Sequence, residues 1–452
     1  MSERAAMSGA EWLARALAGT GMSHVFFVES TLRRTLLHLS DLGVRPILAH
    51  SEKAAAYMAD GYARVARRPG VCMAQSVGAA NLAAGLQDAW LGRSPVIAFS
   101  GRKEPSFQHR NAYQEIPHTP LFAAVTKFSS PVESTSELPR LLRHAWRAAL
   151  AETPRPTHLD FNGLQGDVIE LGETYEALTL ETEAREIPVH RPVADTRDLE
   201  RAAALLTGAR RVAIVAGDSA AMSQAGPEIL ALAEALAAPV ATTLGARGII
   251  PTMHRLSAGV AGSYSAPPAN RIVHSADLVL FIGCDTGDQV TLNWQIPPLT
   301  TPIVQIEADP LEIGRSYPQT TGLVGDPKAT VAHLAEIVGR PARDQSFAEE
   351  AAQIVAEWRA SMVPLVEKQT APIAVERLCA EVTRALPADG VLVADTGYSG
   401  IWTGTMVELN GAGQTYLRAA GSLGWAFPAS LGAKCAAGDR TVICLTGDGG
   451  FY

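Results

Sequence analysis

Short apolar runs alternate along this chain with longer amphipathic stretches, and this alternation constrains the fold more than any other feature. Between the first runs, Glu52–Ala66 and Ala80–Leu91 carry apolar residues at helical spacing. Strands that alternate with helices predict an α/β fold, in which doubly wound parallel sheets are covered on both faces. The apolar runs that we expect to be buried strands are His24–Val28, Val71–Ala74, Pro95–Ser100, Arg211–Ala216, Asp277–Ile282, Pro302–Ile306, Gly390–Ala394 and Arg440–Thr446.

Two polar passages divide the chain into three predicted domains. Leu171–Thr196 loses periodicity and gains acidic residues and prolines, and Gly339–Ser346 precedes a new helix and the last strands. We therefore place the domains at residues 1–185, 186–345 and 346–452, which suits a length of 452 residues. The third domain has barely begun its succession of strands and helices at Tyr452, so we expect it to be truncated in this chain.

Charge and composition exclude several classes of partner. The 38 basic and 46 acidic residues give a net charge of −8, which argues against binding to nucleic acid or an anionic membrane. We find no apolar run long enough to span a bilayer, and the first residues lack the features of a signal peptide. The five cysteines are scattered and show no metal-ligand spacing, so we expect buried thiols in a cytoplasmic protein.

A glycine-rich turn follows the last predicted strand. Residues 446–452 read TGDGGFY, and the carboxyl ends of strands are where open α/β sheets bind ligands. Glycine N–H groups can donate hydrogen bonds to a phosphate, and Asp448 can ligate a divalent cation that bridges to it. Taken alone, the motif is better explained by a tight turn with a locally bonded aspartate, because short motifs recur by chance.

Several further motifs occur in one collinear order. They are SEKAAAYMADGYAR from Ser51, QSVGAANLAAGLQDAW from Gln75, AYQE from Ala112, ADPLEIG from Ala308 and GSLGWAFP from Gly421. With TGDGGFY, they make the chain resemble, over essentially its whole length, the thiamine-diphosphate-dependent superfamily of acetohydroxyacid synthase, pyruvate oxidase and benzoylformate decarboxylase. The resemblance implies pyrimidine-binding, central and diphosphate-binding domains, with thiamine diphosphate and Mg²⁺ as cofactors.

The resemblance also implies a role for Glu52. It matches the family's catalytic glutamate, whose carboxylate bonds the cofactor's pyrimidine ring and promotes loss of the proton on thiazolium C2. The apolar neighbours Ala54–Ala56 and Met58 suit a carboxyl group of raised pKa. The alternative is an exposed glutamate in a first helical turn, stabilised by the helix dipole.

Other positions match the family's cofactor-binding residues. Gly421 matches a residue whose carbonyl receives the aminopyrimidine, and Leu423 matches the side chain that keeps the cofactor bent, although periodicity alone makes Leu423 an ordinary core residue. Asp448 matches the first metal ligand. The glycines that match positions near the diphosphate are Gly397, Gly447, Gly449 and Gly450, and Gly397 is equally well explained as a turn glycine.

Two loops bear on the substrate. Gln114 matches a glutamine on the thiazolium side of the pocket that can polarise a substrate carbonyl, although Gln114 and Glu115 can equally be a solvated loop pair. The family's Gly-x-Pro-Gly turn near the first strand is replaced here, so Glu29, Ser30 and Thr31 are expected to set a different substrate specificity.

The central domain departs from its flavin-binding relatives. The expected glycine triplet is Ala216-Gly217-Asp218, and Gly283–Thr286 lacks the expected arginine. Because a carboxylate beside the flavin diphosphate would repel it, we expect no bound FAD and a vestigial or adenylate-binding central domain.

The resemblance implies a homodimer or homotetramer with active sites at the subunit interface. We expect decarboxylation of a small-molecule 2-oxo acid and transfer to a carbonyl acceptor, as in acetolactate synthase. One alternative is a simple decarboxylase or C–C lyase of the benzoylformate decarboxylase or 2-hydroxyacyl-CoA lyase type, and another is a non-catalytic paralogue that keeps the fold. The sequence shows no GxGxxG between a strand and a helix, which disfavours a nicotinamide-dependent oxidoreductase.

Overall fold

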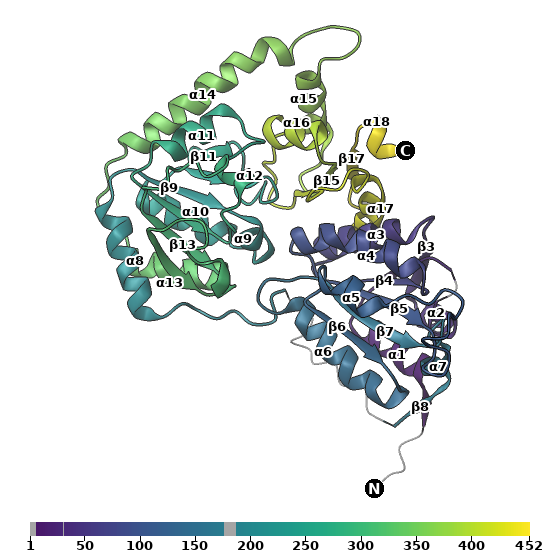
Figure 1. Ribbon diagram of the computed structural model, residues 1–452. Helices are drawn as coiled ribbons and strands as arrows, with labels where there is room; N and C mark the ends of the chain where they lie inside the picture. Colours follow the sequence, from purple (N-terminus) through teal and green to yellow (C-terminus); the bar gives the residue numbers. More distant parts are fainter. Residues whose placement is uncertain (1–5, 30, 176–186) are drawn as a thin grey trace. The chain divides into compact units, whose positions relative to one another are not determined.

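The computed structural model describes residues 6–29, 31–175 and 187–452, and these form two compact units (Figure 1). The first unit takes in the described residues up to Val189 together with Ala420–Val442 and Tyr452. The second unit takes in His190–Ala419 and Ile443–Phe451. A segment from near the end of the chain is therefore part of the unit that the N-terminal residues form.

The first unit is built on a parallel sheet, described here in the strand order β3-β2-β4-β5-β7-β6. Every residue of β4 and β7 is buried, as expected for central strands of a parallel sheet covered on both faces. The strands are β2 (His24–Phe27), β3 (Arg45–Leu48), β4 (Gly70–Ala74), β5 (Val96–Arg102), β6 (Phe128–Val132) and β7 (Thr157–Asn162), and β1 (Met7–Ser8) pairs antiparallel with β8 (Glu173–Thr174).

Helices cover this sheet and one another. Residues of α3 and α4 pack in a common core with Phe26, Cys72 and Ala98, whereas α6 packs on β5, β6 and β7. The helices of the unit are α1 (Gly9–Gly19), α2 (Arg33–Asp41), α3 (Glu52–Ala66), α4 (Gly78–Leu91), α5 (His118–Ala123), α6 (Leu138–Leu150), α7 (Asp167–Leu171) and α17 (Ala426–Ala437).

Helix α17 packs closely against α3. The two backbones approach so nearly that a Cβ added at Gly61 would overlap the carbonyl oxygen of Ala429, and one added at Gly432 would overlap that of Met58. Only a residue without a side chain permits this separation, so the glycines set the distance between the helices.

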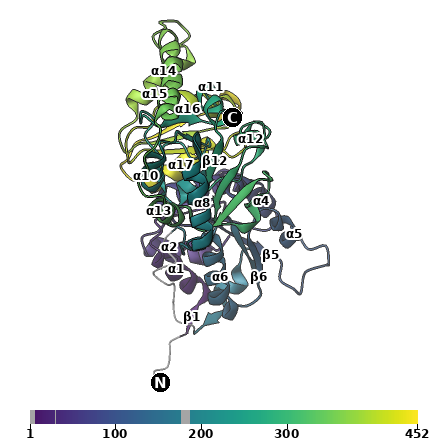
Figure 2. The same ribbon diagram turned by 90° about the vertical axis from the view of Figure 1, so that its left-hand side faces the viewer.

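The second unit contains a parallel sheet in the order β11-β10-β9-β12-β13-β14, among the described residues. Val212 and Ile214 of β9 belong to one hydrophobic core with α8, α10 and α13, whereas Ala213 and Val215 belong to another with α11 and α14. Alternate residues of a strand point to opposite faces, so helices cover both faces (Figure 2). The strands are β9 (Val212–Ala216), β10 (Val240–Thr242), β11 (Ser257–Val260), β12 (Leu278–Ile282), β13 (Ile303–Glu307) and β14 (Thr320–Val324).

A smaller parallel sheet in this unit has the order β16-β15-β17. Its strands are β15 (Val391–Ala394), β16 (Thr415–Arg418) and β17 (Val442–Leu445). The remaining helices of the unit are α8 (Thr196–Gly208), α9 (Asp218–Met222), α10 (Gly226–Leu236), α11 (Pro267–His274), α12 (Asp288–Thr291), α13 (Pro327–Val338), α14 (Ser346–Val366), α15 (Val375–Ala385), α16 (Tyr398–Met406) and α18 (Asp448–Phe451).

The predicted α/β class with parallel sheets is confirmed, and each predicted strand occurs with small shifts at its ends. The domain limits near residues 185 and 345 remain predictions. Cys72, Cys284 and Cys379 are buried as expected, but Cys435 and Cys444 are only half-buried. Across the described ranges, the helices lack the combination of length and apolar character needed to cross a bilayer.

Candidate active site

Glu52 is the first residue of α3, at the edge of the sheet where the parallel strands end. The hydroxyl of Ser51 accepts a hydrogen bond from the backbone N–H of Ala54 at 3.2 Å, which caps the helix and fixes where it begins. The side-chain amide of Asn81 in α4 donates to Glu52 Oε2 at 3.2 Å. Any Cβ at Gly78 would overlap Glu52 Oε1, so the glycine makes room for the carboxylate.

Gln114 contacts the turn that leads into α4. The backbone carbonyl oxygen of Gln114 accepts a very short hydrogen bond from the hydroxyl of Ser76, two residues before Gly78. The side-chain amide donates to the Tyr113 hydroxyl at 3.2 Å, but Oε1 is buried and has no hydrogen-bond partner among the described residues. Gln114 and Glu52 therefore both border the turn of residues 75–78, and Gln114 carries an unused acceptor.

A buried polar network contacts this turn at the carbonyl oxygen of Ser76. His118 Nδ1 lies 2.9 Å from Asp160 Oδ1, and His118 Nε2 lies 3.1 Å from the carbonyl oxygen of Ser76. Both ring nitrogens thus have hydrogen-bonding partners, and each also lies 3.4 Å from a serine hydroxyl, Ser100 at Nδ1 and Ser76 at Nε2. The Ser100 hydroxyl donates to Asp160 Oδ1 at 2.7 Å and contacts His158 Nε2 at 2.7 Å.

The second buried histidine of this network is His158. Burial lowers the pKa of His158 to about 3, although the nearby Asp160 acts to raise it. The ring stacks on Phe122 with centroids 3.6 Å apart, and its Nδ1 lies 2.9 Å from the Ser129 hydroxyl. A neutral ring that donates from Nε2 and accepts at Nδ1 fits these contacts.

The loop predicted to govern specificity is only partly described. Glu29 is exposed and forms a 3.6 Å ion pair with Arg33. Thr31 is buried, and its hydroxyl lacks a partner among the described residues. Ser30 lies outside the described residues. A pocket in this unit is lined by Arg102, Glu115 and His118, among others, and neither Glu29 nor Thr31 lines it.

Gly421 and Leu423 lie in the segment that enters α17. Asp88, at the end of α4, accepts hydrogen bonds from the backbone N–H groups of Ala420 and Ser422, the latter at 3.0 Å. Burial raises the pKa of Asp88, and these hydrogen bonds act to lower it. Gly421 is exposed, and Leu423 is 67% exposed. The alternative that Leu423 is a core residue is therefore wrong.

The glycine-rich segment after β17 belongs to the second unit. Gly447, Asp448 and Gly449 are exposed, and no atom lies within 4 Å of a Cβ built at Gly447 or Gly449. Open backbone N–H groups beside an exposed carboxylate suit a diphosphate with a divalent cation. The described residues include no cluster of three or more metal-binding side chains.

Two further residues of the second unit lie at the end of β15. Gly397 precedes α16 with a φ of 70°. Asp395 is 1% exposed, and its Oδ2 accepts a hydrogen bond from the Thr446 hydroxyl at 3.1 Å. Asp395 was not predicted from the sequence, although an acidic residue directly after the apolar strand Val391–Ala394 was a signal for it.

Three family models match parts of this chain. The N-terminal TPP binding domain of thiamine pyrophosphate enzymes matches residues 7–121, the central domain matches 199–334 and the C-terminal TPP binding domain matches 395–452. The chain belongs to the thiamine pyrophosphate enzymes, in the superfamily of acetohydroxyacid synthase and pyruvate oxidase. It is thus a thiamine-diphosphate-dependent enzyme of the lyase or transferase type.

Individual relatives show which enzymes of this family the chain is similar to. The chain is 30% identical to a probable acetolactate synthase large subunit of Methanocaldococcus jannaschii, over 98% of this chain and 76% of the relative. It is 30% identical to the acetolactate synthase isozyme 2 large subunit of Escherichia coli, over 98% and 79%. It is also 30% identical to a probable 2-ketoarginine decarboxylase of Pseudomonas aeruginosa, over 100% and 79%. The enzyme is therefore similar to acetolactate synthases.

Proposed function

We propose that this enzyme decarboxylates a 2-oxo acid with thiamine diphosphate and Mg²⁺ and transfers the remaining acyl unit to a carbonyl acceptor. The observation that carries the proposal is the placement of Glu52, whose carboxylate lies against Gly78 and accepts a hydrogen bond from Asn81. A carboxylate held between two helix starts in a thiamine-diphosphate-binding domain is positioned to exchange a proton with the cofactor.

Each of the named residues has a distinct task in this proposal. Bound thiamine diphosphate supplies a nucleophilic carbon and an electron sink for decarboxylation. Glu52 holds a proton at a nitrogen of the pyrimidine ring, and Asn81 orients that carboxylate. Gln114 Oε1, which has no partner among the described residues, is free to orient a substrate or its hydrating water.

The second unit would hold the diphosphate end. The backbone N–H groups of Gly447 and Gly449 would donate to phosphate oxygens, joined by that of Gly450 if it gives up its 3.2 Å hydrogen bond to the Gly447 carbonyl oxygen, and Asp448 would bind Mg²⁺. The exposed side chain of Leu423 would support the bent cofactor. We expect no flavin in the central domain, where Asp218 and Asp285 stand, and the visible spectrum of the purified protein checks this.

Replacing Glu52 by glutamine tests the proposal directly. E52Q should abolish exchange of the C2 proton of bound thiamine diphosphate, measured by NMR in deuterium oxide, while calorimetry still detects cofactor binding. The matched control is E11Q, because Glu11 is also a half-buried first-turn helix glutamate, on α1. Undiminished exchange in E52Q would mean that Glu52 is an ordinary helix-start residue.

A second candidate is decarboxylation without transfer. The similarity to a probable 2-ketoarginine decarboxylase favours it. Product analysis after turnover of a 2-oxo acid separates the two, because transfer yields a longer hydroxy-keto product whereas simple decarboxylation yields an aldehyde.

We also propose a homodimer or homotetramer in which Glu52 of one subunit serves the cofactor bound by Asp448 of another. Mixing E52Q with D448N then restores one intact site in each mixed dimer, or about a quarter of wild-type activity after random exchange. If the mixture stays inactive while mixed dimers form, the site lies within one subunit.

A further inference from the structure

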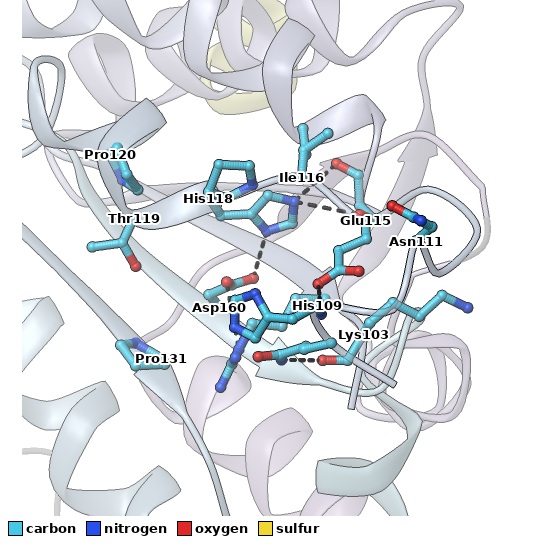
Figure 3. Close-up of a pocket in the computed structure, with 14 residues that line it drawn as sticks. Lys103, His109, Asn111, Glu115, Ile116, His118, Thr119, Pro120, Pro131 and Asp160 are labelled. Atoms are coloured by element: carbon cyan, nitrogen blue, oxygen red, sulfur yellow. Dashed lines mark hydrogen bonds and ion pairs between the residues drawn. The ribbon is translucent and has the colours of Figure 1, made fainter. Parts of the chain in front are cut away.

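A polar pocket of about 670 Å³ lies in the first unit, where strands β5, β6 and β7 end (Figure 3). Its walls include Ser76, Arg102, Lys103, Glu115, His118 and Asp160. Ser76 also belongs to the turn that faces Glu52 through Gly78. The pocket is therefore adjacent to the proposed catalytic carboxylate, and its volume suits a ligand larger than a three-carbon acid.

The carboxylates at this pocket are already occupied by internal donors. Glu115 accepts hydrogen bonds from the backbone N–H of His109 at 2.7 Å and from that of Ala112 at 3.3 Å. Both of its carboxylate oxygens are therefore bonded within their own loop. Asp160 Oδ1 accepts from Ser100 and faces His118, as the dashed contact in Figure 3 shows. Neither acid offers a free pair of oxygens to a cationic ligand.

The cationic groups keep unused hydrogen-bond donors, although Arg102 is ion-paired with two carboxylates. Arg102 Nη2 lies 2.5 Å from Glu133 Oε1, and Arg102 Nε lies 3.6 Å from Asp160 Oδ2, yet neither buried nitrogen has an aligned hydrogen-bond acceptor. The backbone carbonyl oxygen of Lys103 accepts a hydrogen bond from Gln108 Nε2 at 2.5 Å, whereas its ammonium group makes no hydrogen bond or ion pair within the described part of the chain. The hydrogen-bonding capacity left open to a ligand thus comes mainly from positively charged donors.

We infer that this pocket binds a second carboxylate at the far end of the substrate, so that the enzyme acts on a 2-oxo dicarboxylic acid. The planar guanidinium of Arg102 matches a carboxylate in shape, and Lys103 adds a point charge. The inference rests on the proposed function, because the oxo group of the substrate would react at the thiazolium carbon of the cofactor that Glu52 serves while its distal carboxylate reaches Arg102.

Binding to the full-length protein tests the pocket without turnover. Calorimetry should show that 2-oxoglutarate binds at least tenfold more tightly than 2-oxobutyrate, and that glutarate competes. R102Q should weaken 2-oxoglutarate binding by about 10- to 100-fold, the usual effect of losing a charged hydrogen-bond donor. R102K, which keeps the charge and the fold, should lose less, and K103Q less than R102Q.

The matched control is R140Q, because Arg140 is an exposed arginine of α6 in the same unit, paired with Glu137. It should leave both ligands unaffected. Equal affinity for 2-oxoglutarate and 2-oxobutyrate, or an equal effect of R102Q on both, would overturn the inference.

Turnover separates this inference from the proposed function. With thiamine diphosphate and Mg²⁺, R102Q should lower kcat/KM for 2-oxoglutarate by at least tenfold and change that for 2-oxobutyrate less than about twofold. Selective binding without release of carbon dioxide from either acid would refute the proposed function alone. Release from both acids with no dependence on Arg102 would refute only the assignment of the substrate class.

Discussion

The indole N–H of Trp425 donates a hydrogen bond to the carboxylate of Asp60 at 2.9 Å, across 365 positions of sequence. Arg64 binds the same carboxylate through Nε and Nη2, each at 2.7 Å, and its guanidinium lies 4.7 Å from the centre of the Trp425 ring. Asp60 and Trp425 are both fully buried. A satisfied polar cluster therefore joins α3 to α17 inside an otherwise apolar interface.

Replacing Asp60 by asparagine should strongly destabilise the first unit. The change leaves the nearly buried guanidinium of Arg64 without its carboxylate, which costs about 3–5 kcal/mol. W425F removes one hydrogen bond and keeps most of the ring, so it should cost only about 1–3 kcal/mol. Calorimetric unfolding of both variants measures the difference, and a loss in W425F as large as in D60N would contradict the role given to the ion pair.

Replacing Gly61 by alanine should push α3 and α17 apart. The added methyl group would overlap the carbonyl oxygen of Ala429, and overpacking of this kind typically costs about 1–3 kcal/mol. The control is G19A, because Gly19 ends α1 with open space around it, and alanine there should be neutral or slightly stabilising. The unfolding temperature of G61A should therefore fall, whereas that of G19A should stay unchanged or rise slightly.

The neutral state of His158 predicts a stability that falls in acid. Its pKa is about 3 in the folded protein, against an ordinary 6.5, so between these values the unfolded chain binds a proton that the folded chain does not. Stability should then decrease as the pH falls from 6.5 towards 3, with a slope of up to about 1.4 kcal/mol per pH unit from this residue.

The variant H158Q isolates that contribution. Glutamine can still donate to Ser100 but does not titrate, so the dependence on pH should flatten between pH 4 and 6, as measured by denaturant unfolding. H144Q serves as the control, because His144 is exposed on α6 of the same unit. Parallel curves for H158Q and the wild type would show that His158 takes up its proton in the folded state.

Replacing Asp448 by asparagine should weaken cofactor binding only when Mg²⁺ is present. The carboxylate is exposed beside open glycines, and loss of a metal ligand should weaken thiamine diphosphate binding by at least about tenfold. D439N, which alters an exposed aspartate shortly before β17, is the control. Calorimetry with and without Mg²⁺ gives the comparison, and equal affinity of D448N and the wild type would remove Asp448 from the metal site.

Sequence patterns predicted those central strands that are apolar throughout, but missed the buried central strands β7, which carries polar side chains, and β10, which is only three residues long. β4, β9 and β12 are buried along their whole length, and the apolar runs show it. The edge strands β3 and β6 were missed, because their residues are mostly half-exposed and carry no such run. The discontinuity of the first unit was also missed, since local periodicity holds no information about which helix α3 packs against.

Within the candidate site, only the residues that stand in a recognisable motif could be predicted from the sequence. Glu52 and the glycines around Asp448 stand in recognisable motifs, and their assignment as site residues stays a prediction. The network of His118, Asp160 and Ser100 arises from three different elements. Each of these residues is unremarkable in its own segment, and only the fold brings their side chains within hydrogen-bonding distance.

The packing of α17 on α3 has a consequence for synthesis on the ribosome. After the face of α3 around Gly61 has been synthesised, about 365 further residues must emerge before α17 begins, which takes roughly 18–73 s at typical translation rates. During that interval an apolar helix surface stays uncovered in the nascent protein. Chaperone dependence, and sensitivity to premature stop codons before residue 437, are therefore built into the order in which the chain is made.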